Sequence, residues 1–214
     1  MKPRPWRVLI IDDHVVVRDG IRNILDETPG GVTFGEASTP PEATRLVESQ
    51  PWDIAILDLS LAHKSGLELL KDLKAIRPQL PVLVLTMHAE EQYARRAFKA
   101  GASGYVTKCV SRAELLKAIN KTIDGGRYVS PELAEKLVAD LGKPFDGAPH
   151  ESLSDREFEV LRLIGSGKTL SEIATLLSLS DKTISTYRAR ILGKMSMKNN
   201  SELTQYAIRS KLVD

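Results

Sequence analysis

The chain has 214 residues, of which 42% are hydrophobic and 27% charged, and its formal net charge is +2. This composition is ordinary for a soluble globular protein of one or two domains, and the net charge identifies no partner. No apolar run is long enough for a membrane-spanning helix or a secretory signal. The single cysteine, Cys109, excludes an internal disulfide and fits a reducing cytoplasm.

The first half of the chain alternates between two kinds of segment. Short runs rich in Val and Ile are typical of strands buried on both faces; they lie at residues 7–11, 32–36, 53–57, 81–86 and 104–107. Amphipathic segments of helical period lie at about residues 14–27, 39–49, 65–76, 89–100 and 111–124. A strand followed by a helix five times predicts a doubly wound, five-stranded parallel (βα)5 sheet with helices on both faces.

The pattern changes after Gly125 and Gly126. The stretch SPELAEKLVADL predicts one helix, with Ser130 as N-cap and Pro131 at its first position. Residues 142–152 contain several Gly and Pro and read as a linker. No strand pattern follows, and four helices fit residues 154–165, 169–177, 181–195 and 200–210. We therefore expect an α/β domain at 1–127, a linker with a short helix at 128–152 and an all-α domain at 153–214.

Acidic residues follow two of the predicted strands. Asp12 and Asp13 end the first strand and Asp58 ends the third, and functional groups of a doubly wound sheet gather at the carboxyl ends of its strands. Three carboxylates at one edge repel one another unless a cation joins them, and hard oxygen ligands suit Mg2+. Taken alone, two acids after a strand are more often a helix N-cap than a metal site, so the other strand ends decide between the two interpretations.

Those other strand ends carry groups that suit phosphoryl transfer. Thr86 ends the fourth strand and Lys108 follows the fifth. A hydroxyl and an ammonium at the same edge surround an arriving phosphoryl group with donors and positive charge. A carboxylate can act as the nucleophile and form an acyl phosphate. Asp58 is the candidate nucleophile, because Asp12 and Asp13 are better placed to hold the metal.

The histidines and the cysteine in this half receive a simpler interpretation. His14, His63 and His88 lack the clustering of a metal site that uses imidazole ligands, so we expect them to be loop or surface residues. We expect Cys109 to be a small loop residue rather than a redox sensor, although the neighbouring Lys108 could lower the pKa of its thiol.

Residues 7–125 resemble the receiver domain of two-component response regulators. The matching residues are Asp12, Asp13, Asp58, Thr86, Tyr105 and Lys108, together with the stretches SGLELL and AGASGYVTK. The resemblance implies a strand order of 2-1-3-4-5 and a phosphoryl transfer from a sensor histidine kinase to Asp58. It also implies that Asp13, Asp58 and the backbone carbonyl of Ser60 bind Mg2+ directly, and that Asp12 acts mainly through water.

The same resemblance assigns the remaining groups of the site. It implies that Thr86 and Lys108 contact the phosphoryl group and that Tyr105 acts with Thr86 as a conformational switch. Three positions in two loops depart from the common receiver pattern. Leu61 and Ala62 stand where Met and Pro are frequent, so the loop should be less rigid. Cys109 follows Lys108 where many receivers have Pro, so a cis peptide bond is not expected.

The segment TLSEIATLLSLSDKTISTYRARILGKM has the pattern of a helix–turn–helix motif. Ala174 is small where two helices cross, Ser178 lies near the turn, and Ser180 is a good N-cap for the second helix. Helical spacing directs Ile184, Tyr187, Ile191 and Met195 inward. It directs Ser185, Thr186, Arg188 and Ala189 outward, towards the major groove of DNA. Lys182, Thr183, Arg190 and Lys194 are expected to reach phosphates, and a solvated basic helix in a small bundle is the alternative.

Residues 153–211 resemble the LuxR-type DNA-binding domain, and its attachment to a receiver is typical of NarL/FixJ-type response regulators. The matching stretches are LSDREFEVLRLI, IATLLSLSDKTISTYRARILGKM and KNNSELTQYAI. The resemblance implies a cytoplasmic transcription regulator that binds promoter DNA as a homodimer and acts with RNA polymerase. The dimer contact is expected on the last helix, at Leu203, Tyr206, Ala207 and Ile208, unless these side chains only close the domain core.

Two other functions use the same residues. One is a Mg2+-dependent phosphatase, although DLS at Asp58 lacks the second carboxylate of a D-x-D pattern. The other is a regulator whose receiver dimerises without phosphorylation. Incubation with acetyl phosphate and Mg2+, followed by measurement of the intact mass, distinguishes these alternatives from a phosphorylated regulator.

Overall fold

The structure of the chain is a computed structural model that describes residues 5–26, 28, 30–61, 65–87, 91–135 and 148–213. Contacts within the chain divide it into two units, Met1–Asp140 and Leu141–Asp214. Within the described ranges, no helix combines the length and the apolar character that crossing a membrane requires.

Within the described residues, the first unit contains a parallel sheet of six strands. The predicted strands form as β1 (Trp6–Ile11), β2 (Val32–Ala37), β3 (Ile54–Leu57), β4 (Val82–Thr86) and β5 (Gly104–Thr107). A short sixth strand, β6 (Tyr128–Val129), pairs in parallel with β5. The order is β2-β1-β3-β4-β5-β6, so the parallel sheet and the order of its first five strands are confirmed.

The structure adds one short strand, β6, to the five that the sequence predicts. This strand is only two residues long, too short for a hydrophobic period to reveal it. Tyr128 is 3% exposed and packs into the core of the sheet, and its hydroxyl donates to Glu114 Oε1 at 2.8 Å. Burial and that hydrogen bond raise the pKa of Tyr128 to about 12. The first residues of the predicted linker therefore belong to the sheet.

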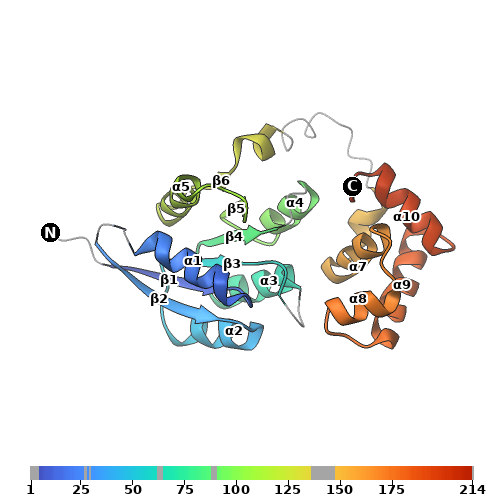
Figure 1. Cartoon of the computed structure of the whole chain (residues 1–214), viewed down its shortest axis with the longest axis horizontal. Coiled ribbons are helices and arrows are strands. Elements are labelled where there is room, and N and C mark those ends of the chain that lie inside the picture. The colour runs from blue at the N-terminus through green and yellow to red at the C-terminus, as the bar shows by residue number, and fades with distance from the viewer. Residues whose placement is uncertain are drawn as a thin grey trace. The chain divides into compact units, whose positions relative to one another are not determined.

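Helices cover both faces of the sheet (Figure 1). They are α1 (Val15–Leu25), α2 (Pro40–Ser49), α3 (Gly66–Ile76), α4 (Glu91–Lys99) and α5 (Arg112–Ile123). One core cluster joins Val8 and Ile10 of β1 to side chains of α1 and α5. Because side chains alternate along a strand, Leu9 and Ile11 point to the other face, and they are also fully buried. Burial on both faces explains why the strands are continuous apolar runs.

The predicted helix at 130–141 is described only in part. Residues 131–135 are helical, and the Leu133 amide donates to the Ser130 hydroxyl at 3.3 Å, as expected for an N-cap. Residues 136–147 lie outside the described part of the chain, as do Ala62, His63 and His88.

The described part of the second unit, residues 148–213, folds into helices joined by turns. A short 3-10 helix, η1 (Pro149–Ser152), precedes α7 (Asp155–Gly165), α8 (Leu170–Leu176), α9 (Asp181–Met195) and α10 (Asn200–Arg209). A capping box of Ser154 and Glu157 begins α7, and Thr169 with Glu172 forms a second one on α8. Helices α7 and α10 pack so closely at Gly165 that an added Cβ atom would lie 2.6 Å from the Ala207 side chain.

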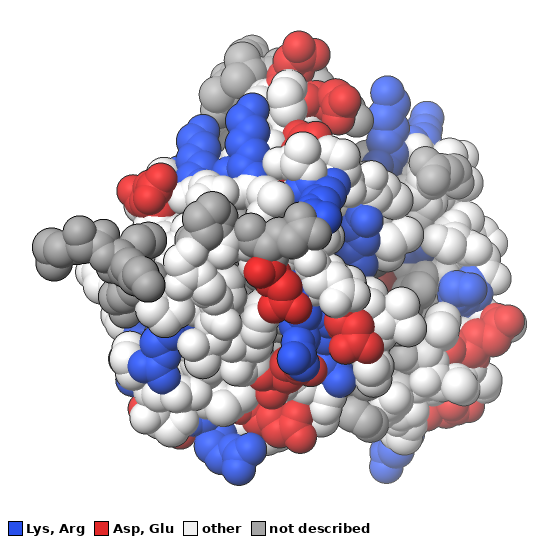
Figure 2. Space-filling model, turned by 60° about the vertical axis from the view of Figure 1, so that its left-hand side comes forward, with Lys and Arg blue, Asp and Glu red and all other residues white. Residues whose placement is uncertain are grey.

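Charged side chains of both signs are mixed on the surface. On the face drawn in Figure 2, basic and acidic side chains lie among one another, in keeping with a formal net charge of only +2. Attraction to a polyanion must therefore come from a local group of basic residues, since the chain as a whole creates no strong positive field.

Candidate functional site

The carboxyl edge of the sheet brings the predicted site residues together. Asp12 follows β1, Asp58 follows β3, Thr86 ends β4 and Lys108 follows β5. Asp12 and Asp58 are each 2% exposed, and Thr86 is fully buried. Two carboxylates this deeply buried need partners that offset the loss of water.

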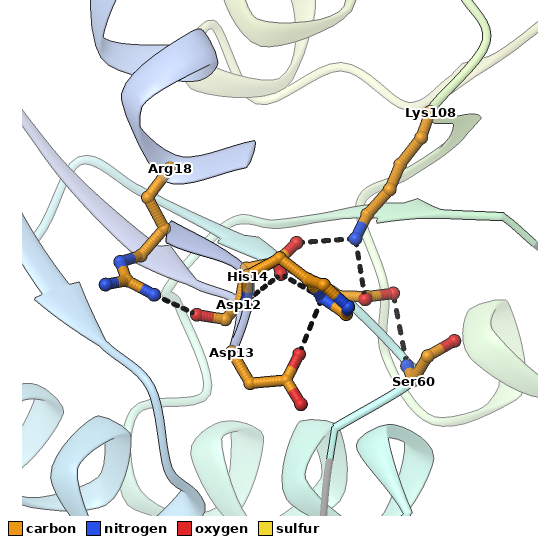
Figure 3. A network of polar contacts seen from close by, with 7 residues as sticks. Asp12, Asp13, His14, Arg18, Ser60 and Lys108 are labelled. Carbon is orange, nitrogen blue, oxygen red and sulfur yellow. Dashed lines mark hydrogen bonds and ion pairs between the residues drawn. The ribbon is translucent and has the colours of Figure 1, made fainter. Parts of the chain in front are cut away.

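Lys108 is the partner of both carboxylates (Figure 3). Its Nζ atom lies 2.6 Å from Asp12 Oδ2 and 2.7 Å from Asp58 Oδ2. Burial alone would lower the pKa of Lys108, but its hydrogen bonds and charge contacts with the two carboxylates outweigh burial and raise it. The lysine is therefore held as a cation beside the candidate nucleophile.

The loop after β3 fixes the second oxygen of Asp58. The Ser60 backbone amide donates to Asp58 Oδ1 at 3.1 Å, and the Asp58 amide donates to the Ile11 carbonyl at 2.9 Å. Gly66 begins α3 against this loop, where an added Cβ would lie 2.4 Å from Leu59 Cα. The SG of SGLELL thus allows α3 to pack directly behind the candidate nucleophile.

An acidic cluster that could hold a metal lies at the same edge. It consists of Asp12, Asp13, His14 and Asp58, whose potential ligand atoms all lie within 4.8 Å of one another. The Asp13 side chain is 28% exposed and, unlike Asp12 and Asp58, has no ion pair with Lys108 within the described part of the chain. Carboxylates of this number and spacing suit a divalent cation with part of its hydration shell retained.

His14 belongs to this cluster, which sequence reasoning missed. Its Nδ1 atom lies 2.8 Å from Asp13 Oδ1 and 3.1 Å from Asp12 Oδ1. The interpretation of His14 as a simple loop or surface residue is therefore incomplete, although its side chain is 63% exposed. Its position directly after two acids was the available signal.

Arg18 is a second residue that sequence reasoning missed. Its Nη1 donates to the Asp12 carbonyl at 2.8 Å, and its Nε donates to Glu36 Oε2 at 2.9 Å. Hydrogen bonds from Arg18 and from Arg22 hold the pKa of Glu36 below its ordinary value. Arg18 thereby ties the backbone that carries Asp12 to β2.

The two predicted switch residues lie on neighbouring strands. Thr86 pairs with Thr107, and Val84 pairs with Tyr105, so Thr86 and Tyr105 point to the same face of the sheet. Tyr105 is fully buried. The positions suit a coupled movement of the two side chains, which stays a prediction.

The second unit contains the predicted helix–turn–helix geometry in α8 and α9. Ile173, Ala174, Ile184 and Ile191 are at most 3% exposed and form the contact between the helices and the rest of the unit. Ser178, in the turn, has φ of 53°, a conformation for which Gly is more common. Ser180 caps α9 by accepting a hydrogen bond from the Thr183 amide at 3.1 Å.

The outer side of α9 is an exposed stripe. Its members are Lys182, Ser185, Thr186, Ala189 and Arg190. Their spacing of three or four residues places them on one side of the helix, opposite the buried Ile184, Ile191 and Met195. Tyr187 is half-buried, in keeping with its predicted inward position, and Thr183 is half-buried beside its cap.

Two basic residues of α9 lie elsewhere than expected. Arg188 was expected to face outward, but it is half-buried and its Nε donates to Asn200 Oδ1 at the start of α10. Lys194 was expected to reach phosphates, but its Nζ lies 2.6 Å from Glu157 Oε2, a side chain that is 4% exposed. Both depend on partners in other helices, which the period of α9 alone does not reveal.

The predicted dimer contact on α10 also requires a correction. Leu203 and Ala207 are fully buried within the unit, because they pack where α10 meets α7, and cannot form a surface contact. Tyr206 is half-buried, and its hydroxyl lies 2.6 Å from His150 Nδ1. Ile208 is 54% exposed and borders a shallow groove with Ser201, Thr204 and Gln205.

Comparisons with known proteins agree with both halves of this description. Residues 8–120 match the family described as response regulator receiver domain, and residues 151–207 match the bacterial regulatory proteins of the luxR family. Response regulator GacA of Pseudomonas aeruginosa is 34% identical over 209 residues, which cover 97% of this chain and 98% of GacA. Response regulator UvrY of Escherichia coli is 33% identical over 206 residues, which cover 96% of this chain and 94% of UvrY.

Solved structures of the regulator RcsB are similar over the whole chain. RcsB of Salmonella enterica serovar Typhimurium, bound to a promoter in the presence of the phosphomimetic BeF3−, is 29% identical with a TM-score of 0.65. A structure of two RcsB dimers bound to two parallel DNAs is 28% identical with a TM-score of 0.60. Each match covers 95% of this chain and 98% of RcsB. With its acidic edge and its helix–turn–helix unit, the chain belongs to the NarL/FixJ-type two-component response regulators, which join a receiver domain to a LuxR-type DNA-binding domain.

Proposed function

We propose that a sensor histidine kinase phosphorylates this regulator on Asp58 in the presence of Mg2+, and that the phosphorylated chain binds promoter DNA as a dimer. The buried Asp58 carboxylate, held by Lys108 and by the Ser60 amide, carries this proposal. Regulation of transcription from such a complex would involve RNA polymerase and would take place in the cytoplasm.

The chain's own groups have distinct parts in the transfer. A carboxylate oxygen of Asp58 forms a bond to phosphorus while the bond between phosphorus and the donor's histidine nitrogen breaks, which leaves an acyl phosphate. The Lys108 ammonium lies where negative charge on the phosphoryl oxygens would collect, and the Thr86 hydroxyl is a further donor at this edge. Mg2+, held by Asp13, Asp58 and the Ser60 carbonyl, with Asp12 acting mainly through water, would offset the charge of the carboxylates and the phosphoryl group.

Incubation with acetyl phosphate and Mg2+ tests the proposal. The full chain should gain the mass of one phosphoryl group, and omission of Mg2+ should prevent the gain. A Mg2+-dependent phosphatase would instead release phosphate repeatedly. A regulator that dimerises without phosphorylation would show no adduct.

The first prediction concerns the metal ligands. Asp13→Ala should weaken Mg2+ binding far more than Ser60→Ala, because Asp13 offers its carboxylate whereas Ser60 offers only its backbone carbonyl. Isothermal titration of the full chain with Mg2+ measures both variants. Equal impairment of the two variants would show that this ligand set is wrong.

For the DNA complex, we propose that the exposed stripe of α9 enters the major groove. Ser185 and Thr186 can hydrogen-bond to base edges, whereas Ala189 offers only a methyl contact, which favours a thymine methyl. Lys182 and Arg190 are the exposed cations of the stripe and suit phosphate contacts. Thr183, beside its cap, can add a hydroxyl contact at the start of the helix.

A second prediction separates charge from base reading. Arg190→Ala should weaken binding to all sequences alike and lower the salt slope by about one unit, because it removes one phosphate contact. Arg188→Ala should leave the base preference unchanged, because the Arg188 side chain is hydrogen-bonded to Asn200 and lies outside the exposed stripe. Binding of the full chain to a randomised site library at several salt concentrations measures both effects. Relaxed preference at one base pair in Arg188→Ala would return Arg188 to the base-reading group.

A third prediction concerns the dimer. We propose that α10 forms the contact through Ile208 and the groove beside it, with the exposed edge of Tyr206 as a neighbour. Ile208→Asp should reduce the complex on palindromic DNA from two protomers to one, while Ile208→Val, which keeps an apolar side chain, should retain two. Sedimentation of the full chain with DNA gives the stoichiometry, and two protomers in both variants would place the interface elsewhere.

A further inference from the structure

His14 lies between two carboxylates of the metal cluster. In Figure 3 its ring lies between the carboxylates of Asp12 and Asp13, and Nδ1 is 2.8 Å from Asp13 Oδ1 and 3.1 Å from Asp12 Oδ1. The His14 amide also donates to Asp12 Oδ1 at 2.8 Å. This backbone hydrogen bond thus fixes the Asp12 carboxylate beside the imidazole.

Helix capping does not account for the position of this ring. His14 is the N-cap residue of α1, yet its side chain makes no capping hydrogen bond. The usual reason for a polar side chain at this position is to accept a bond from an amide of the first turn. Here the imidazole turns away from the helix and towards the acidic cluster.

The distances within the cluster suit a single ion. The ligand atoms of Asp12, Asp13, His14 and Asp58 lie within 4.8 Å of one another. Ligands about 2.1 Å from one ion lie at most about 4.2 Å apart, so small side-chain rotations close the remaining difference. Because the His14 side chain is 63% exposed, its ring can rotate without losing buried contacts.

We propose that His14 supplies an imidazole nitrogen to this site as a ligand and thereby raises the affinity of the site for borderline divalent ions such as Ni2+ or Zn2+. The inference rests on the metal site of the proposed function and extends the range of ions that it takes. Mg2+ prefers oxygen ligands and gains little from an imidazole, whereas Ni2+ and Zn2+ gain from one. A borderline ion would then compete with Mg2+ at the carboxylates.

Titration of the full chain with Mg2+ and with Ni2+ tests this inference. His14→Asn removes the imidazole but keeps a residue that is favourable at an N-cap, so the start of α1 should be preserved. We expect Ni2+ affinity to fall by about tenfold or more and Mg2+ affinity to remain unchanged. Asp13→Asn, which removes the charge of a shared ligand, should weaken both ions and serves as the matched control.

Two results would overturn the inference. If His14→Asn weakens both ions alike, His14 acts by orienting Asp13 and is not a ligand. If neither affinity changes, the ring has no part in metal binding. Phosphoryl uptake separates this inference from the proposed function: His14-dependent Ni2+ binding by a chain that takes up no phosphoryl group would contradict only the proposed function.

Discussion

Asp58→Asn is expected to abolish phosphoryl uptake from acetyl phosphate. The substitution keeps the shape of the side chain but replaces the carboxylate that contacts both Lys108 and the Ser60 amide with an uncharged amide. An amide is a far weaker nucleophile than a carboxylate, so no acyl phosphate should form. Intact-mass measurement after incubation with Mg2+ and acetyl phosphate gives the result directly.

The control for this variant is Asp26→Asn. Asp26 is an exposed acid at the end of α1, so the same change of carboxylate to amide occurs away from the carboxyl edge of the sheet. Uptake should be undiminished there. Full labelling of Asp58→Asn would show that the nucleophile is Asp12 or Asp13 instead. If the unaltered chain also takes up no phosphoryl group, the proposed phosphorylation is contradicted.

The acidic edge could be predicted from the sequence because its residues occupy equivalent places in a repeating pattern. Each of Asp12, Asp58, Thr86 and Lys108 stands at the end of an apolar run, and parallel strands bring such ends to one edge. Local signals also mark the helix starts, since the capping boxes at Ser154 and Thr169 each span only four residues.

The features that the sequence did not predict depend on contacts between distant segments. Arg18 is recognisable as a site residue only because Glu36, 18 positions away on β2, holds its guanidinium near Asp12. Arg188 turns from the exposed stripe towards Asn200, 12 positions away. The helical period predicts the side of the helix on which each side chain lies. A long cationic side chain at the boundary between two sides instead points towards its hydrogen-bond partner.

Lys194 stabilises the second unit through its contact with the capping box of α7. Glu157 accepts hydrogen bonds from the Ser154 amide at 2.7 Å and from Lys194 Nζ at 2.6 Å, and so joins the start of α7 to the end of α9. Burial alone would raise the pKa of Glu157, but the bonds from Lys194 and Ser154 outweigh it and lower the pKa. The pair therefore stabilises the unit above the pKa of an unfolded glutamate, and this stabilisation is lost as pH falls through the lower folded value.

Lys194→Met should consequently destabilise the second unit at neutral pH. The variant keeps an apolar stem but leaves the Glu157 carboxylate, which is 4% exposed, without its cation. We expect a loss of about 1–3 kcal/mol in the free energy of opening α7, because a buried charged acceptor loses one hydrogen bond. This expected loss is smaller than the cost of breaking a fully buried ion pair, since the Lys194 side chain is 42% exposed. Hydrogen exchange of the α7 amides in the full chain measures this loss.

The same variant distinguishes stability from DNA contact. Because Glu157 already neutralises its charge, Lys194→Met should leave the salt slope of DNA binding unchanged once the fraction of folded protein is corrected for, whereas Arg190→Ala lowers it. Lys198→Met is the matched control for exchange, since the Lys198 side chain is exposed and it is the backbone amide of this residue that donates to Glu202. Faster α7 exchange in Lys194→Met alone would establish Lys194 as the anchor of Glu157. A lower salt slope with unchanged exchange would instead return Lys194 to the phosphate-binding group.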